Sequence, residues 1–179
     1  MTKHNERRDR YRELVKEAGL GGAFITHAAN RYYLSGFELH DPQCNESAGA
    51  LLIHPDIPGE DWLLTDPRYV DAAKRHWPEE RIFVYQGARV EQIRQFLGKV
   101  IPQGRELGIE PKGLDVFTYQ SLAKDLSLTP FDGMVEKLRI SKDEDEIAAM
   151  RKSCAINHQV MERVPAMLEQ GMSEAELYW

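Results

Sequence analysis

The sequence of 179 residues has few cysteines and no long apolar run, and each shortage excludes a class of protein. Its two cysteines, Cys44 and Cys154, lack the spacing of a metal site, so we interpret them as reduced thiols of a cytoplasmic protein. Apolar runs such as 50–53 are far too short to cross a bilayer. The first residues are polar and charged, unlike those of a signal peptide. We therefore expect no membrane partner.

An excess of positive charge is also missing, because 23 Lys and Arg stand against 29 Asp and Glu, for a formal charge of -6. Nucleic-acid-binding proteins usually carry a basic face, so we expect no nucleic-acid partner. The catalytic motifs H-E-x-x-H and G-x-S-x-G are absent, as is the phosphate-binding motif G-x-x-x-x-G-K-S/T. The length suits one good-sized domain plus a fragment.

The apolar pattern predicts an α/β domain over about residues 1–133. Two apolar runs flank a loop that contains proline and glycine, which predicts a β-hairpin. Strands and helices alternate after it, which predicts parallel pairing with helices on the sheet faces. The predicted helices are 7–18, 27–34, 68–77, 90–101 and 115–126, and the predicted strands are 23–26, 47–54, 61–65, 81–85 and 106–110. Together they indicate a mixed β-sheet flanked by helices. The segment G-L-G-G at 19–22 follows a helix, so we interpret it as a helix end.

Two predicted helices have an apolar face that should be buried. In 68–77 the face consists of Val70, Ala73 and Trp77. In 115–126 it consists of Val116, Tyr119, Leu122, Ala123 and Leu126.

Residues 141–179 are typical of the start of a second domain, which is expected to continue beyond this sequence, with 134–140 as a linker. Ser141 and Glu144 have the spacing of a capping box, and Ser173 and Glu176 repeat it. The acidic cluster 143–146 suits a helix start, because consecutive helical residues diverge and cannot converge on one metal ion. Pro165 is expected to kink or interrupt the helix. The apolar stripe of this helix is Ile147, Met150, Cys154, His158 and Met161.

Four segments carry a resemblance to a known family. R-I-S-K-D-E-D-E-I at 139–147 and G-M-S-E-A-E-L at 171–177 resemble the start of the catalytic domain in creatinase-like, pita-bread metallopeptidases, although Ser141 and Lys142 stand in reversed order. These enzymes include Xaa-Pro aminopeptidases and Xaa-Pro dipeptidases. N-R-Y-Y-L-S-G-F at 30–37 is similar to the family's N-x-x-Y-L-T-G-F, and L-T-D-P-R-Y at 64–69 to its L-x-T-D-x-R-Y.

The resemblance implies a ribonuclease-H-like N-terminal domain that helps dimer assembly and restricts access to the active site. The parent enzyme would hydrolyse the bond preceding proline in short peptides, using two divalent metal ions (manganese, cobalt or zinc). Its ligands, two Asp, a His and two Glu, are expected beyond Trp179, so this chain should contain no cofactor and be inactive alone. Its partners would be its own catalytic domain and a second copy in a homodimer. The alternatives are a peptide- or protein-binding module without peptidase activity, or a creatinase-like amidinohydrolase.

The resemblance also implies candidate residues at the mouth of a substrate cleft. They are Tyr33, Phe37, Glu38, His40, Asp66, Arg68 and Tyr69. Core packing is the alternative for Tyr33 and Phe37, as it is for Tyr32. For Arg68, placed where a helix start disfavours a cation, the alternative is an internal salt bridge. The loop 38–46 is alternatively an ordinary surface loop or an independent metal site.

Overall fold

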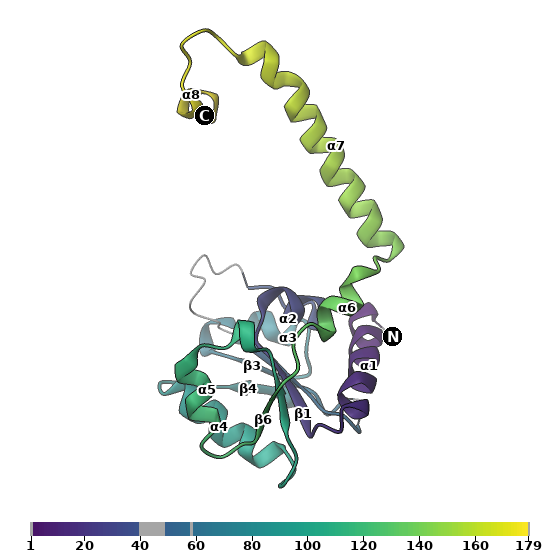
Figure 1. Ribbon diagram of the computed structural model, residues 1–179, viewed down its shortest axis with the longest axis vertical. Helices are drawn as coiled ribbons and strands as arrows, with labels where there is room; N and C mark the ends of the chain where they lie inside the picture. Colours follow the sequence, from purple (N-terminus) through teal and green to yellow (C-terminus); the bar gives the residue numbers. More distant parts are fainter. Residues whose placement is uncertain (1, 40–48, 58, 179) are drawn as a thin grey trace. The chain divides into compact units, whose positions relative to one another are not determined.

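A computed structural model describes residues 2–39, 49–57 and 59–178 (Figure 1). The chain divides into two compact units, Met1–Arg139 and Ile140–Trp179. The helices up to the end of the first unit are α1 (Lys3–Glu17), α2 (Ala28–Ser35), α3 (Val70–Lys74), α4 (Arg89–Val100), α5 (Val116–Leu122) and α6 (Met134–Ile140), with short 3-10 turns at Pro67–Tyr69, Glu79–Arg81 and Pro111–Gly113. The strands are β1 (Gly22–Ile25), β2 (Gly49–Ile53), β3 (Trp62–Thr65), β4 (Ile82–Val84), β5 (Leu107–Ile109) and β6 (Leu128–Pro130).

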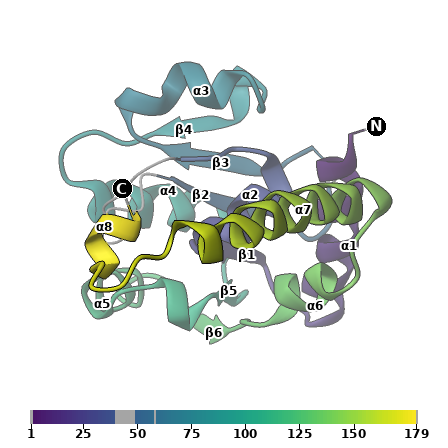
Figure 2. The same ribbon diagram turned by 90° about the horizontal axis from the view of Figure 1, so that it is seen from above.

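The six strands form one mixed sheet in the order β4-β3-β2-β1-β5-β6, which Figure 2 shows from β4 at the top of the view to β6 at the bottom. β2 pairs antiparallel with β1 and β3, while the other pairs are parallel. The predicted hairpin and the parallel portion are both confirmed. β6 was not predicted, because a three-residue strand ending in proline carries little periodicity.

Both faces of the sheet are covered, and the strands alternate between two apolar clusters with a period of two residues. Ala23 and Ile25 of β1 join the first cluster, whereas Phe24 joins the second. The first cluster receives side chains from α1, α2, α3 and α6, and the second from α4 and α5. Figure 1 shows α1 and α6 on one side of the sheet and α4 and α5 on the other.

Helix α1 ends in a Schellman motif. The N–H of Leu20 donates to the carbonyl of Val15 (3.2 Å), and the N–H of Gly19 donates to that of Lys16 (2.9 Å). Gly19 has a φ of 69°, a conformation that glycine adopts without steric cost. The interpretation of 19–22 as a helix end is therefore confirmed.

Helix α5 corrects the face predicted for 115–126. It ends at Leu122, so the predicted stripe has too few turns to form. Val116 and Tyr119 are 71% and 45% exposed, and the buried residues of the helix are Thr118, Ser121 and Leu122. Asp115 is the N-cap of α5, because its carboxylate accepts from the N–H (2.8 Å) and the hydroxyl (2.6 Å) of Thr118.

Two further segments differ from expectation. The predicted linker 134–140 forms α6, because Val135 has an apolar site to fill in the first cluster. The predicted helix 68–77 is a 3-10 turn followed by α3. Ala73 and Trp77 are buried as predicted, although Trp77 lies beyond the helix, and Val70 is only partly buried.

The second unit holds α7 (Glu144–Met167) and α8 (Glu174–Tyr178). The cap of α7 is Asp143, not Ser141, because Asp143 and Glu146 form the reciprocal capping box two residues later, with both bonds at 2.9 Å. The box of Ser173 and Glu176 is confirmed. Helix α7 ends two residues after Pro165, and none of its residues is buried.

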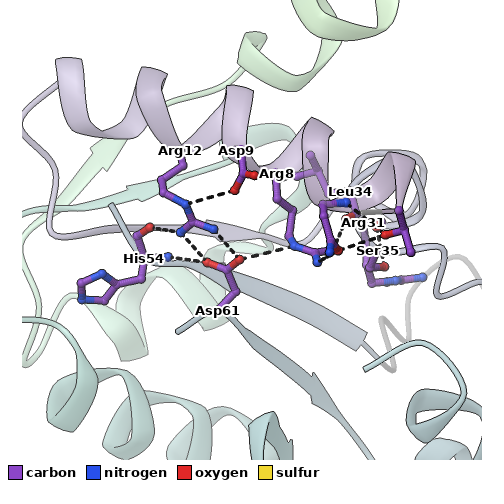
Figure 3. A network of polar contacts seen from close by, with 10 residues as sticks. Arg8, Asp9, Arg12, Arg31, Leu34, Ser35, His54 and Asp61 are labelled. Atoms are coloured by element: carbon purple, nitrogen blue, oxygen red, sulfur yellow. Dashed lines mark hydrogen bonds and ion pairs between the residues drawn. The ribbon is translucent and has the colours of Figure 1, made fainter. Parts of the chain in front are cut away.

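A buried ion pair ties α1 to the turn between β2 and β3 (Figure 3). Arg12 and Asp61 are 4% and 2% exposed, and their two parallel hydrogen bonds are both 2.8 Å. Asp61 also accepts from the N–H of His54 (3.0 Å) and lies 3.4 Å from Nε of Arg8. Burial alone would lower the pKa of Arg12, but the hydrogen bond and charge of Asp61 raise it overall.

We predict that Asp61→Ala lowers the free energy of unfolding by about 3–5 kcal/mol, because it leaves the buried guanidinium of Arg12 without its bidentate partner and removes a partner of the half-buried Arg8. Asp125→Ala is the matched control, since it breaks the exposed pair of Asp125 with Arg94 and should cost at most about 1 kcal/mol. Urea unfolding of both variants measures the difference. Equal losses would contradict the buried role of Asp61.

Candidate functional site

The carboxyl ends of five strands meet at one edge of the sheet, because only β2 runs the other way. In open α/β sheets, ligands bind outside the carboxyl ends of the strands. Here Thr26 follows β1, Asp66 follows β3, Tyr85 follows β4 and Glu110 follows β5. We call this region the carboxyl edge and take it as the candidate site.

The structure separates the residues predicted to line a cleft. Tyr33 and Phe37 are 8% and 0% exposed and belong to the first apolar cluster, so core packing accounts for their side chains. Glu38 is exposed. His40 lies outside the described residues. A role of any of these residues at a cleft stays a prediction.

Asp66, Arg68 and Tyr69 form a corner of the carboxyl edge. Asp66 caps the turn that Pro67 begins, by accepting from the N–H of Arg68 (2.8 Å). The same carboxylate pairs with Nη2 of Arg68 (2.7 Å), and this hydrogen bond is the main reason that the pKa of Asp66 is lowered. The guanidinium lies 5.3 Å from the ring centre of Tyr69. The Arg68 side chain is 61% exposed, so this internal ion pair still faces solvent.

A buried carboxylate at the same edge escaped the sequence analysis. Glu110 is 5% exposed, and its Oε2 accepts from the N–H groups of Thr26 and His27, both at 2.7 Å. His27 is the N-cap of α2 but makes no side-chain capping bond, so Glu110 caps that helix from a distant strand. The only local signal is a charged residue directly after a buried strand. Burial raises the pKa of Glu110, the charge of Glu136 adds to this, and its hydrogen-bond donors offset it in part.

Asn30 adds a third donor to the two N–H groups around Glu110, and we call these donors the cradle of Glu110. Its Nδ2 donates to Oε1 of Glu110 (2.6 Å) and of Glu136 (2.9 Å). Its Oδ1 accepts from Nη1 of Arg139 (2.9 Å). Burial by itself raises the pKa of Glu136, but the Asn30 hydrogen bond and nearby positive charges lower it overall.

Two hollows lie at the carboxyl edge. The larger, about 320 Å³, is lined by His27, Glu110, Lys112, Asp132 and Glu136, with two glycines. The smaller, about 40 Å³, has Thr26, Tyr85, Arg89 and Thr118 among apolar neighbours. The hydroxyl of Thr26 is buried and has no hydrogen-bond partner among the described residues. Burial raises the pKa of Tyr85 to about 12, although three arginines nearby oppose the shift.

The part of the chain that the structure describes contains no group of three or more His, Cys, Asp and Glu side chains that could hold a metal ion. Among residues 2–39, 49–57 and 59–178, no helix has the length and apolar character needed to span a membrane. The carboxyl edge therefore offers charged side chains and two hollows for recognition, but its described residues do not form a metal centre.

The fold and sequence place the chain in a family. Residues 7–141 match the creatinase/prolidase N-terminal domain, and the chain belongs to that family. The mixed sheet with its flanking helices is the fold of the N-terminal part of Xaa-Pro peptidases. The resemblance seen in the sequence motifs is thereby confirmed.

Individual relatives extend this match. An uncharacterized peptidase of Bacillus subtilis, YqhT, is 26% identical over 169 residues, which cover 93% of this chain and 44% of that protein. An Xaa-Pro dipeptidase from Bacillus anthracis is 25% identical with a TM-score of 0.81, over 97% of this chain and 46% of that one. The N-terminal domain of the cytoplasmic peptidase PepQ from Mycobacterium tuberculosis is 27% identical with a TM-score of 0.60, over 74% of this chain and 98% of that domain. The chain thus spans less than half the length of the longer relatives.

We predict that Glu110→Gln changes how stability depends on pH. The folded pKa of Glu110 is raised above its ordinary value, so the native state binds more protons between the two values. Its contribution to stability is fully present below the unfolded pKa and is lost as pH rises through the folded pKa. The wild type should therefore lose stability relative to Glu110→Gln as pH rises from the ordinary pKa of a glutamate carboxyl group through the raised folded pKa of Glu110.

Urea unfolding at several pH values measures this difference. Glu106→Gln provides the reference, because it removes an exposed carboxylate at the other end of β5. The same pH slope for both variants would contradict the prediction.

Proposed function

We propose that this chain is the N-terminal, non-catalytic part of a metal-dependent Xaa-Pro aminopeptidase or dipeptidase, whose remaining part hydrolyses the bond preceding proline. The observation that carries the proposal is the likeness to the Bacillus anthracis Xaa-Pro dipeptidase, which extends over nearly the whole chain. Short proline-containing peptides are the proposed substrates of the parent protein, and the cytoplasm is its proposed location. The relative from Mycobacterium tuberculosis, itself described as a cytoplasmic peptidase, supports that location.

The proposed division places the N-terminal domain within the first unit and the start of the catalytic domain at 141–179. What supports it is the apolar stripe of α7. Ile147, Met150 and Met161 are 37%, 53% and 56% exposed, although such side chains are usually covered. The rest of the catalytic domain would cover them in the intact protein.

The metal ions of the parent, two divalent cations such as manganese, cobalt or zinc, do not fit the described residues, which form no suitable ligand group. We propose that their ligands lie in the rest of the parent protein, as the family resemblance implies, where the ions would activate water for hydrolysis. The proposed role of this chain is to help assemble a homodimer and to narrow access to the active site. The exposed Arg68 at the carboxyl edge supports such a role.

We predict that the purified chain hydrolyses no Xaa-Pro dipeptide and retains no stoichiometric manganese, cobalt or zinc after dialysis. An intact Xaa-Pro dipeptidase serves as the positive control in the same assay and elemental analysis. One tightly held metal ion per chain, or turnover above background, would contradict this. If the parent protein does not hydrolyse Xaa-Pro peptides, the alternative of a binding module is favoured. If it hydrolyses creatine, the alternative of an amidinohydrolase is favoured.

Arg68→Ala in the full-length protein should change substrate handling or assembly more than Arg81→Ala does. Arg81 is a matched control, because it precedes β4 at the opposite edge of the sheet and has its own ion pair with Glu60. We expect a change of roughly 3- to 10-fold in kcat/KM, or a shift in oligomeric size, for Arg68→Ala alone. Steady-state kinetics and light scattering measure both, and equal small effects would remove Arg68 from the site.

A further inference from the structure

We propose that Asn30 and Tyr33 form a clasp that holds helix α6 on the sheet and so fixes where the chain leaves the N-terminal domain. These two residues are the first and fourth of the segment N-R-Y-Y-L-S-G-F, and they lie three positions apart on α2, one turn along the same face. Both bond to α6, which is more than 100 positions later in the chain. The proposal rests on the proposed function in that it takes the segment after α6 to be the start of the catalytic half.

Asn30 is the inner half of the clasp. It is 0% exposed, and its amide uses both N–H donors and its carbonyl. The donors go to Glu110 on the sheet side and to Glu136 on α6, and the carbonyl accepts from Arg139. The two carboxylates fix the orientation of the amide, because a flipped carbonyl oxygen would face two negative charges.

Tyr33 is the second half. Its hydroxyl donates to the carbonyl of Leu138 at 3.2 Å. Leu138 lies in the last turn of α6, where the carbonyls have no partner within the helix. The phenol therefore satisfies an acceptor that belongs to the end of α6.

The clasp is anchored to the sheet through Glu110. The backbone N–H groups of Thr26 and His27 hold that carboxylate at the end of β1. Asn30 bonds to this fixed carboxylate and to Glu136, and so holds α6 in place relative to β1. The apolar contact of Val135 adds burial, but contact of this kind has no direction. Hydrogen bonds at both ends of α6 define its orientation as well as its attachment.

The test is amide hydrogen exchange on the 179-residue chain, comparing α6 with α1 in each variant. Asn30→Asp removes both donors and places a third carboxylate between Glu110 and Glu136. Its α6 amides should exchange about tenfold or more faster relative to the α1 amides. Tyr33→Phe removes the hydroxyl alone and should give about a fivefold relative increase.

Tyr32→Phe is the matched control, because Tyr32 neighbours Tyr33 on α2 but is 49% exposed. It should leave the ratio of α6 to α1 exchange unchanged. If Asn30→Asp fails to fold, the ratio of α6 to α1 exchange in Tyr33→Phe, compared with that in Tyr32→Phe, still tests the clasp. Equal acceleration of α6 and α1, or no acceleration in Tyr33→Phe, would overturn the clasp.

In the full-length protein, Tyr33→Phe should also lower kcat/KM for an Xaa-Pro dipeptide about fivefold while Tyr32→Phe does not. Faster α6 exchange with unchanged kcat/KM would overturn the positioning role. A wild-type parent without peptidase activity would refute the proposed function and leave the exchange result standing, so the two failures are distinguishable.

Discussion

The arrangement of the carboxyl edge depends on the hydrogen bonds that the carboxylate of Glu110 accepts. An ionised carboxyl group is costly to bury unless donors surround it, and here two backbone N–H groups and one amide do so. Those donors belong to the end of β1 and to α2, while Glu110 itself follows β5. Strands β1 and β5 and helix α2 are therefore fixed relative to one another at a single point.

The two edges of the sheet differ in character. Where β2 turns into β3, the bidentate pair of Arg12 and Asp61 is sealed beneath α1. At the carboxyl edge, the pair of Asp66 and Arg68 faces solvent. Helices cover both faces of the sheet, and the carboxyl edge combines charged side chains with the two hollows described above.

The elements with several periodic apolar residues could be predicted from the sequence. The hairpin of β2 and β3 and the helix α4 were found, because each buries enough side chains to set a period. The predicted face of α5 was wrong, since the helix ends at Leu122 and buries Thr118 and Ser121 in place of Val116 and Tyr119. The cradle of Glu110 could not be predicted, because its donors lie 80 or more positions away and a lone charged residue has no pattern. The role of Arg68 at a cleft stays a prediction.

The capping of α2 by a distant strand has a consequence for the order of folding. His27 provides no capping bond of its own, so the first turn of α2 has no local side-chain cap until residue 110 arrives. Loop closure over such a distance is slow compared with helix formation. We therefore expect α2 to fray in a nascent chain that has not yet emerged as far as β5, and to become stable only when β5 pairs with β1.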